Sequence, residues 1–137
     1  MRVSIITACY NRADTVGDAI ESVLAQDYPD IEYIVVDGAS TDGSMEVIER
    51  YKFKLSKFIS EPDHGMYEAI NKGIRMATGD IIGLVHSDDM LFDKHVISDI
   101  VQKMQKTDAE FLYGNGIFVD KNNMDKIVRK WRGGGYF

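Results

Sequence analysis

The sequence predicts an α/β protein with an open, mostly parallel sheet flanked by helices. Two observations carry this prediction. Short runs rich in β-branched residues alternate with segments of helical periodicity, and most of those runs are apolar at successive positions. Strands of a parallel sheet are covered on both faces, so they read as continuous hydrophobic runs. The 137 residues match the length of one ordinary domain, and we expect residues 1–137 to form it.

The first third of the chain predicts a strand, a helix and a second strand. Residues 3–8 and residues 31–36 are the two strand-like runs. Between them, apolar side chains recur at the three- and four-residue spacing of a helix, and Asn11 or Asp14 is available to cap its start. These apolar side chains are Val16, Ala19, Ile20, Val23 and Leu24.

A turn rich in Ser, Thr, Asp and Gly follows at residues 38–43, with Ser40 or Thr41 as the expected cap of the next helix. The inward face of that helix is predicted to carry Met45, Ile48 and Tyr51. Residues 53–60 form a shorter and weaker strand signal.

The next predicted pair is a helix over residues 65–77 and a strand over residues 81–85. Gly79 is expected to act as the glycine that ends the helix. The expected inward side chains of this helix are Met66, Ile70, Ile74 and Ala77.

A fourth helix and two further strands complete the pattern. The helix is indicated by the apolar spacing of Val96, Ile97, Ile100, Val101 and Met104. The strands are expected over residues 111–119 and 127–131.

Composition limits the function classes. Sixteen Lys and Arg against 22 Asp and Glu give a net charge of −6, which disfavours a nucleic-acid partner. A lone cysteine, Cys9, excludes an intramolecular disulfide and a cysteine-cluster metal site. No apolar run approaches the roughly 20 residues that span a bilayer, and the first residues read as a strand, not as a signal peptide. We therefore expect a cytoplasmic protein.

One basic cluster stands out against the acidic background. It is either a solvated strand face or a contact for an anionic acceptor or for the inner face of the plasma membrane, which would make the protein peripheral there. Its residues are Lys121, Lys126, Arg129, Lys130 and Arg132.

Open parallel sheets bind ligands at the carboxyl ends of their strands. Four segments follow predicted strands, and we expect them on one edge of the sheet. They are residues 8–11, 37–40, 61–64 and 86–89, and three of the four carry acids. The chain lacks G-x-G-x-x-G. Gly38 and Gly43 have the spacing of a phosphate loop, but Ser44-Met45 stands where Lys-Ser/Thr is needed.

Asp88-Asp89 is the sharpest local feature. Adjacent carboxylates after an apolar strand suit Mg²⁺ or Mn²⁺, which keeps positions open for water and substrate phosphates. The alternative is that the pair caps the following helix. Asp37 can bind a ribose hydroxyl or a base N–H, or it can form an Asx-turn with Gly38. Tyr10 can stack on a base or pack on the neighbouring helix.

Two histidines, His64 and His86, flank these acids, and each reads more simply as a structural residue than as a ligand. Cys9 is expected to be buried and inert.

Four stretches together resemble the family 2 glycosyltransferases, over residues 3 to about 105. They are Val3–Asn11, Ile34–Gly43, Glu61–Gly73 and Ala77–Asp89. The likeness is greatest to bacterial enzymes that build cell-surface polysaccharide. It implies the GT-A fold, a Rossmann-like domain. It also implies inverting transfer of a hexosyl group from a nucleotide-diphosphate sugar, most often UDP-linked, to a saccharide or lipid-linked acceptor, with Mn²⁺ or Mg²⁺.

The resemblance also assigns roles. Ala8 and Tyr10 would line the nucleoside pocket with Asn11 beside them, Asp37 would bind the base or ribose, and Asp63 would sit beside the nucleoside. Ser87 and Asp88 would contact the donor, and Asp88 and Asp89 would hold the metal, Asp89 being the stronger candidate. Two departures stand out. His86 occupies the place of a first aspartate, and Ile70 replaces an arginine whose charge Lys72 would supply.

The catalytic base of the family lies in a later part of the domain. We therefore expect it beyond residue 137, so that this chain holds the donor-binding half without the acceptor side. Two other functions compete with a glycosyltransferase. One is a nucleotide- or metal-binding module without catalysis, or an inactive fragment. The other is a nucleotidyltransferase, which should carry a glycine-rich loop after the first strand, whereas residues 8–12 contain no glycine.

Overall fold

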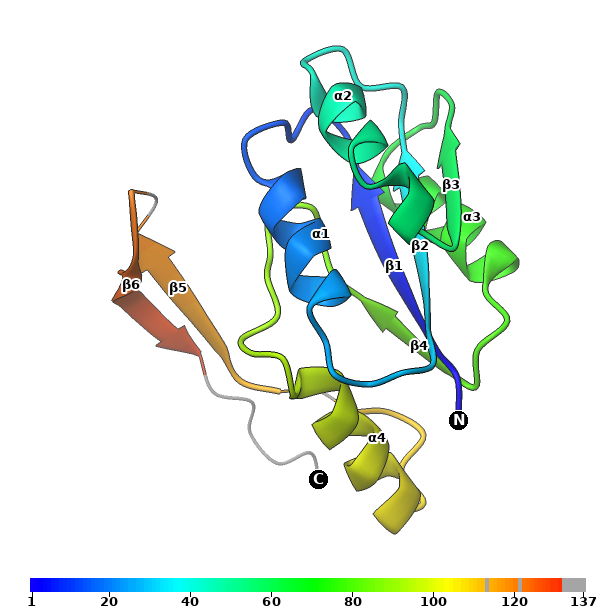
Figure 1. Ribbon diagram of the computed structural model, residues 1–137, viewed down its shortest axis with the longest axis vertical. Helices are drawn as coiled ribbons and strands as arrows, with labels where there is room; N and C mark the ends of the chain where they lie inside the picture. Colours follow the sequence, from blue (N-terminus) through cyan, green and yellow to red (C-terminus); the bar gives the residue numbers. More distant parts are fainter. Residues whose placement is uncertain (113, 121, 132–137) are drawn as a thin grey trace. The chain divides into compact units, whose positions relative to one another are not determined.

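A computed structural model describes the chain except residues 113, 121 and 132–137. It divides into two compact units, Met1–Val101 and Gln102–Phe137. The first unit contains a parallel sheet of four strands in the order β3-β2-β1-β4 (Figure 1). The strands are β1 (Val3–Cys9), β2 (Ile31–Asp37), β3 (Lys57–Ser60) and β4 (Ile81–Leu84). The predicted parallel sheet is therefore confirmed.

Helices connect these strands and cover the sheet on both faces. Figure 1 shows α1 and α2 in front of the sheet and α3 behind it. A helix of the 3₁₀ type, η1 (Lys52–Lys54), precedes β3, and α4 begins in the first unit and ends in the second. The α-helices are α1 (Val16–Leu24), α2 (Ser44–Glu49), α3 (Met66–Met76) and α4 (Val96–Lys106).

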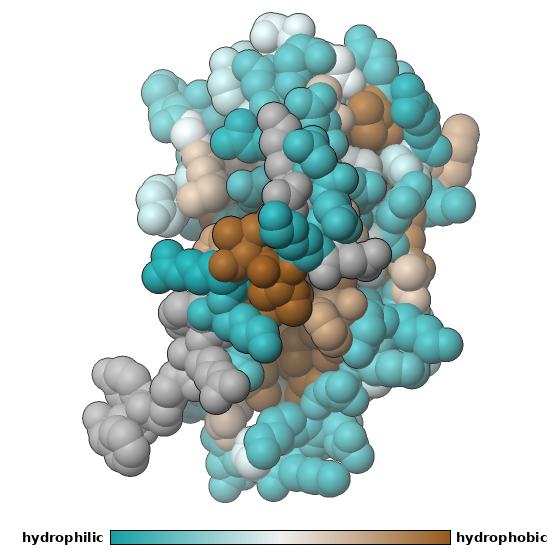
Figure 2. Space-filling view, turned by 90° about the vertical axis from the view of Figure 1, so that its left-hand side faces the viewer, coloured by the Kyte–Doolittle hydropathy of each residue, from teal (hydrophilic) through white to brown (hydrophobic). Residues whose placement is uncertain are grey.

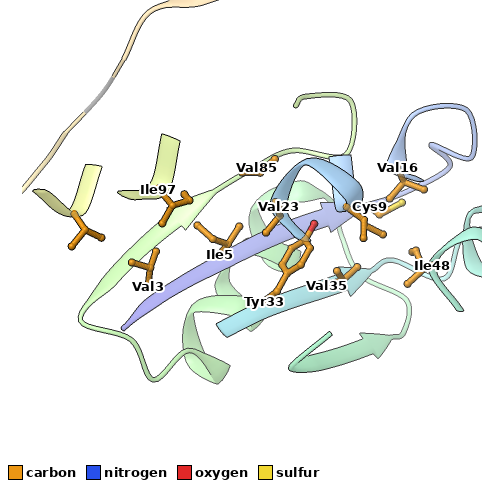
Figure 3. Close-up of a cluster of buried hydrophobic side chains, with 12 residues drawn as sticks. Val3, Ile5, Cys9, Val16, Val23, Tyr33, Val35, Ile48, Val85 and Ile97 are labelled. Carbon is orange, nitrogen blue, oxygen red and sulfur yellow. The ribbon is translucent and has the colours of Figure 1, made fainter. Parts of the chain in front are cut away.

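Each face of the sheet has its own hydrophobic cluster. On the α1 face, alternate residues of β1 and β2 such as Ile5 and Tyr33 contact Val23 of α1 and Ile97 of α4 (Figure 3). On the α3 face, the intervening residues contact Ala69 and Ile70 of α3; they are Ile6, Ala8, Ile34 and Val36. Burial of both faces explains why these strands lack the alternation of a half-exposed sheet.

The strand register brings the carboxyl ends of the strands to one level. Cys9 pairs with Asp37, and Asp37 pairs with Ser60, so β1, β2 and β3 end together. Leu84 pairs with Ile6, so the residues that follow β4 run alongside the end of β1. The four strand-end segments therefore share one edge, as the sequence predicted.

Three expected helix boundaries are wrong. The N-cap of α1 is Thr15 and that of α2 is Gly43, and neither cap makes a side-chain hydrogen bond to its helix. Asn11, Asp14, Ser40 and Thr41 therefore do not cap these helices. The third is the end of α3, where the C-cap is Ala77 and not Gly79. Glycine is required at position 79 for close packing, because a Cβ there would lie 2.8 Å from the Ser4 backbone nitrogen.

Some predicted inward positions and strand bounds also differ. Met66 and Ile74 are 48% and 43% exposed, because α3 contacts the sheet through Ala69, Ile70 and Gly73. The third strand is confined to Lys57–Ser60, because residues 52–54 form η1.

The second unit contains an antiparallel pair, β5 (Gly116–Asp120) and β6 (Asn123–Trp131). The first of these strands therefore starts later, and the second earlier, than predicted. Ile117, Phe118, Ile127 and Val128 are exposed on it. The Arg129 guanidinium lies 5.8 Å from the centroid of the Phe118 ring. Of the predicted basic cluster, Lys121 and Arg132 lie outside the described residues.

Hydrophilic side chains cover most of the surface seen in Figure 2, with smaller hydrophobic patches between them. No helix within the described ranges has the length and apolarity to cross a bilayer.

Candidate functional site

A cavity of about 950 Å³ opens at the carboxyl edge of the sheet. All four strand-end segments contribute to its wall. The lining residues are Ala8, Cys9, Tyr10, Arg12, Gly38, Ala39, Pro62, Asp63, Gly65, Met66, Ala69, His86, Ser87, Asp88 and Asp89. This volume falls in the range of small-molecule sites, and its position is where open α/β sheets bind ligands.

Side chains of the loops after β1 and β2 tie these loops together. The Asn11 backbone nitrogen donates to Ser40 Oγ at 2.9 Å, and the side-chain oxygen Asn11 Oδ1 accepts from the Thr41 backbone nitrogen at 2.8 Å. Asp42 accepts from the Ala13 backbone at 3.1 Å and from Ser44 Oγ at 2.6 Å. Asn11 has a φ of 50°, which asparagine tolerates better than most residues. Asn11 therefore joins two loops and does not line the cavity.

Asp37 is fully buried beneath the second loop and does not line the cavity. Its Oδ1 accepts from Ser40 Oγ at 2.5 Å, and its Oδ2 accepts from the Ser40 backbone at 2.9 Å and from Ser60 Oγ at 2.8 Å. These donors supply the hydrogen bonds that a buried carboxylate requires. The structure thus shows Asp37 holding the loop that forms the cavity wall.

Asp63 approaches the cavity against the backbone of Gly38. A Cβ at Gly38 would lie 2.8 Å from Asp63 Oδ2, so glycine makes room for this carboxylate. Asp63 Oδ1 accepts from the Gly65 backbone at 3.0 Å, which fixes its direction. This loop therefore presents a carboxylate in a defined orientation.

Lys72 lies behind the Asp63 loop and does not line the cavity. Its Nζ is 3.0 Å from Glu61 Oε1 and 3.8 Å from Glu68 Oε1, and it donates to Pro62 O at 3.4 Å. Glu68 also accepts from the His64 backbone and side chain, and the hydrogen bond from His64 lowers the Glu68 pKa. Lys72 is thus placed to support the loop.

Asp88 and Asp89 follow β4 and face the cavity. The Asp89 nitrogen donates to His86 O at 3.0 Å in a turn. The next helix, α4, starts only at Val96, so the alternative that the two acids cap it is wrong. Desolvation by the surrounding protein, followed by the charge of Asp88, raises the pKa of Asp89. The site therefore holds two carboxylates that repel each other.

This donor set fits a hard divalent cation. No group of three or more His, Cys, Asp or Glu is gathered for a metal among the described residues. However, Mg²⁺-type ions bind through one or two carboxylates together with water and substrate phosphates. Desolvation is the larger cause of the raised Asp89 pKa, and the repulsion from Asp88 that adds to it is what such a cation would relieve.

Six of the predicted site residues line the cavity: Ala8, Tyr10, Asp63, Ser87, Asp88 and Asp89. The sequence did not single out Arg12, which lines the cavity beside them. The sequence did contain a signal for Arg12, because it is a cation in the loop after the first strand, at an edge rich in acids. Burial raises the pKa of Cys9 to about 11, which agrees with the inert thiol that we expected.

The fold and the site together define a Rossmann-like α/β protein with an acidic strand-end cavity. Its sequence matches the model of the family described as glycosyl transferase family 2 over residues 4–136. The chain belongs to that family.

Relatives and solved structures agree with this family. An uncharacterized glycosyltransferase of Nostoc sp. is 34% identical over 93% of this chain and 40% of its own length. Poly-beta-1,6-N-acetyl-D-glucosamine synthase of Staphylococcus epidermidis is 35% identical over 66% of this chain and 23% of its own. This chain therefore spans less than half the length of either relative.

Among solved structures, S. aureus TarS 1–349 in complex with UDP-GlcNAc has a TM-score of 0.71 at 27% identity, covering 77% of this chain and 32% of that one. The mannosyltransferase PcManGT from Pyrobaculum calidifontis, in complex with GDP-Man and Mn²⁺, has a TM-score of 0.71 at 26% identity, covering 90% and 37%. The expected GT-A fold is thereby confirmed.

Proposed function

We propose that this chain forms the donor-binding part of an inverting glycosyltransferase that uses a nucleotide-diphosphate sugar, with a UDP-sugar as the first candidate. The cavity carries the proposal, because its wall has two adjacent carboxylates next to an exposed tyrosine at the edge where α/β sheets bind nucleotides. The relatives support it, since one is named as a polysaccharide synthase and one solved neighbour binds UDP-GlcNAc.

The charges of the cavity favour binding of a diphosphate together with a cation. Of the described residues, three carboxylates line it, those of Asp63, Asp88 and Asp89, together with one guanidinium, that of Arg12. A diphosphate entering alone would be repelled, whereas a divalent cation at Asp88 and Asp89 would cancel their two negative charges. When bound there, Mn²⁺ or Mg²⁺ would stabilise the negative charge that develops on the leaving diphosphate.

The residues of the chain itself have separate tasks in this proposal. Tyr10 is 59% exposed and can stack on the base, while Asp63 can accept from a base N–H or a ribose hydroxyl. Arg12 can pair with a phosphate oxygen. Asn11, Asp37 and Lys72, which we predicted as donor-binding residues, would act by holding the loops.

Acceptor activation needs a further base, which removes the proton of the attacking hydroxyl. Among the described lining residues, the carboxylates are Asp63, Asp88 and Asp89, and the proposal uses all three for donor and metal. We therefore expect no sugar transfer from residues 1–137 alone. Sugar transfer to any saccharide or lipid-linked acceptor by this polypeptide would contradict that expectation.

The deciding experiment is calorimetric titration with UDP, GDP and dTDP, with and without Mn²⁺. We expect saturable binding of UDP that requires Mn²⁺ and is lost in Asp89→Ala. The control is Asp14→Ala, which removes the same charge from an exposed residue outside the cavity wall and should bind as the wild type does. Absence of binding by every nucleotide would refute the proposal for this chain.

The competing function needs a second measurement, because the titration does not separate it. A non-catalytic nucleotide- or metal-binding module would bind UDP and Mn²⁺ equally well. The test is release of UDP from UDP-sugars by a longer polypeptide of the same gene in the presence of saccharide acceptors. Failure to release UDP would favour the non-catalytic module.

A cytoplasmic location stays a prediction, with contact at the inner face of the plasma membrane through Lys126, Arg129 and Lys130 as its peripheral form. Cell fractionation at low and high salt tests both parts, because an electrostatic contact with anionic lipid is released by salt.

A further inference from the structure

The segment that carries Asp88 and Asp89 is an eleven-residue connection with neither helix nor strand, from residue 85 to residue 95. Two of its apolar side chains, Met90 and Phe92, are 47% and 80% exposed and contribute little to holding it. Leu91 is partly buried against the core. Val85, at its start, is buried in the core, so apolar contacts anchor the segment at Val85 and Leu91, and polar contacts must fix the residues after Leu91.

Polar groups at the end of α1 hold the segment. Ser22 Oγ accepts from the Leu91 backbone nitrogen at 3.1 Å. Gln26 Nε2 donates to Asp93 O at 2.6 Å, and Gln26 Oε1 accepts from the Ile97 backbone nitrogen at 3.0 Å. We call Ser22, Gln26 and the adjoining Asp27 the α1 clamp.

Asp27 extends the α1 clamp to the start of α4. Its backbone nitrogen donates to Lys94 O at 2.9 Å. Its carboxylate lies 2.5 Å from His95 Nδ1 and accepts from Ser98 Oγ. Hydrogen bonds from Ser98 and His95 lower the pKa of Asp27. This carboxylate is therefore ionised and engaged at neutral pH.

Gln26 is the member of the α1 clamp that bridges. Its side-chain Nε2 donates to the segment before α4, and its Oε1 accepts from the first turn of α4. Nε2 also donates to Ser22 O at 3.1 Å, which fixes the side chain against the last turn of α1. A carboxylate lacks the donor and an apolar side chain lacks both functions, so glutamine suits this position chemically.

We infer that Gln26 is a positioning residue of the donor site, acting through the α1 clamp to hold Asp88 and Asp89 where a divalent cation and a diphosphate would meet them. The inference rests on the proposed function. It adds a residue that does not line the cavity and lies more than 60 positions earlier in the chain. Gln26 holds the carbonyl of Asp93, four residues after Asp89, and Ser22 holds Leu91, two residues after it, so the α1 clamp acts on the segment close to the carboxylates.

The test variant is Gln26→Met, which keeps the length of the side chain and removes both hydrogen-bonding ends. We expect Mn²⁺-dependent UDP affinity to fall roughly tenfold, the loss that corresponds to one well-made hydrogen-bonded anchor. In an Asp89→Glu background, which keeps a carboxylate and leaves weakened but measurable UDP binding, Gln26→Met should have little further effect, because the two changes act on the same element. A general weakening of the fold would instead lower affinity in both backgrounds.

The control is Tyr51→Phe, which removes a 2.6 Å hydrogen bond to Glu21 on the same helix but away from the segment. It should leave UDP affinity unchanged. Ser22→Ala serves where Gln26→Met does not fold; it removes the acceptor for Leu91 and a hydrogen bond to Ala19 O within α1. Hydrogen exchange of the amides of residues 86–92 provides a readout without nucleotide, and we expect faster exchange in both clamp variants.

The outcomes separate this inference from the proposed function. Wild-type binding of UDP with Mn²⁺, unchanged in Gln26→Met, overturns the positioning role and leaves the proposed function standing. An equal loss in the Asp89→Glu background also overturns it. Failure of the wild type to bind any nucleotide refutes both. Unaltered exchange of residues 86–92 in the clamp variants refutes the clamp itself.

Discussion

Replacing Glu32 by glutamine should destabilise the fold through a buried polar cluster at the amino ends of the strands. Glu32 is 6% exposed. Its Oε1 accepts from Ser4 Oγ and from the Thr78 backbone, both at 2.8 Å. Its Oε2 accepts from Thr78 Oγ1 at 2.9 Å and lies 3.3 Å from Lys57 Nζ. Glutamine keeps one accepting oxygen and sets an NH₂ group against the other donors.

The magnitude can be worked out from these contacts. Desolvation alone would raise the Glu32 pKa, but the hydrogen bonds from Thr78 and Ser4 outweigh it and lower the pKa from 4.5 to about 2. A difference of that size between the folded and unfolded states corresponds to roughly 3 kcal/mol. Leaving buried donors unpaired costs about 1–3 kcal/mol. We therefore expect Glu32→Gln to lose about 1–3 kcal/mol, or about 4–12 °C in Tm.

The pH dependence has a defined sign. Because the folded-state pKa of Glu32 is depressed, its stabilisation is complete above about pH 4.5 and is lost as the pH falls from 4.5 towards 2. Thermal unfolding followed by circular dichroism at several pH values should show the wild type and Glu32→Gln far apart at pH 6 and converging below pH 4. The control is Glu49→Gln at an exposed position, which should follow the wild type throughout. Equal Tm values for Glu32→Gln and the wild type at pH 6, or a gap at pH 2 as large as that at pH 6, would refute this reasoning.

Three other sites in the chain give further predictions. Gly38→Ala should push the Asp63 carboxylate aside, because its Cβ would lie 2.8 Å from Asp63 Oδ2. Calorimetry should then show Mn²⁺-dependent UDP binding weakened about five- to tenfold, with little change in Tm. An affinity equal to that of the wild type would contradict this prediction. Gly79→Ala should cost about 1–3 kcal/mol in urea unfolding, because its Cβ would lie 2.8 Å from the Ser4 backbone nitrogen, and an unchanged midpoint would exclude that clash. Cys9, with its pKa raised to about 11 by burial, should react with iodoacetamide at pH 8 about a hundredfold more slowly in the folded protein than in urea, and comparable rates would show that the thiol is open.

The sequence was informative where physical chemistry acts locally. Doubly apolar strands predicted a covered parallel sheet, and the shared direction of the strands then predicted that Asp63 and Asp88 would meet at one edge. The identity of the residues after each strand was enough to place Tyr10 and Ser87 in the same wall.

The sequence was less informative where two elements compete for one side chain. Asn11 could have capped a helix, but it bonds to Thr41 of a loop 30 residues away. Asp37 is the last residue of a strand that is buried on both faces, so no alternation showed which layer its carboxylate enters. Met66 and Ile74 have helical spacing, yet the close contact of Gly73 with the sheet directs them outward. These outcomes depend on partners that are distant in sequence.

Among the residues that the structure describes, all those that line the cavity fall between positions 8 and 89, within the first compact unit. During evolution, the stretch of gene that encodes the chain after residue 101 could be exchanged, lengthened or duplicated without altering a single codon for the cavity wall. If the cavity binds the sugar donor as proposed, related genes could keep one donor site while the acceptor changes.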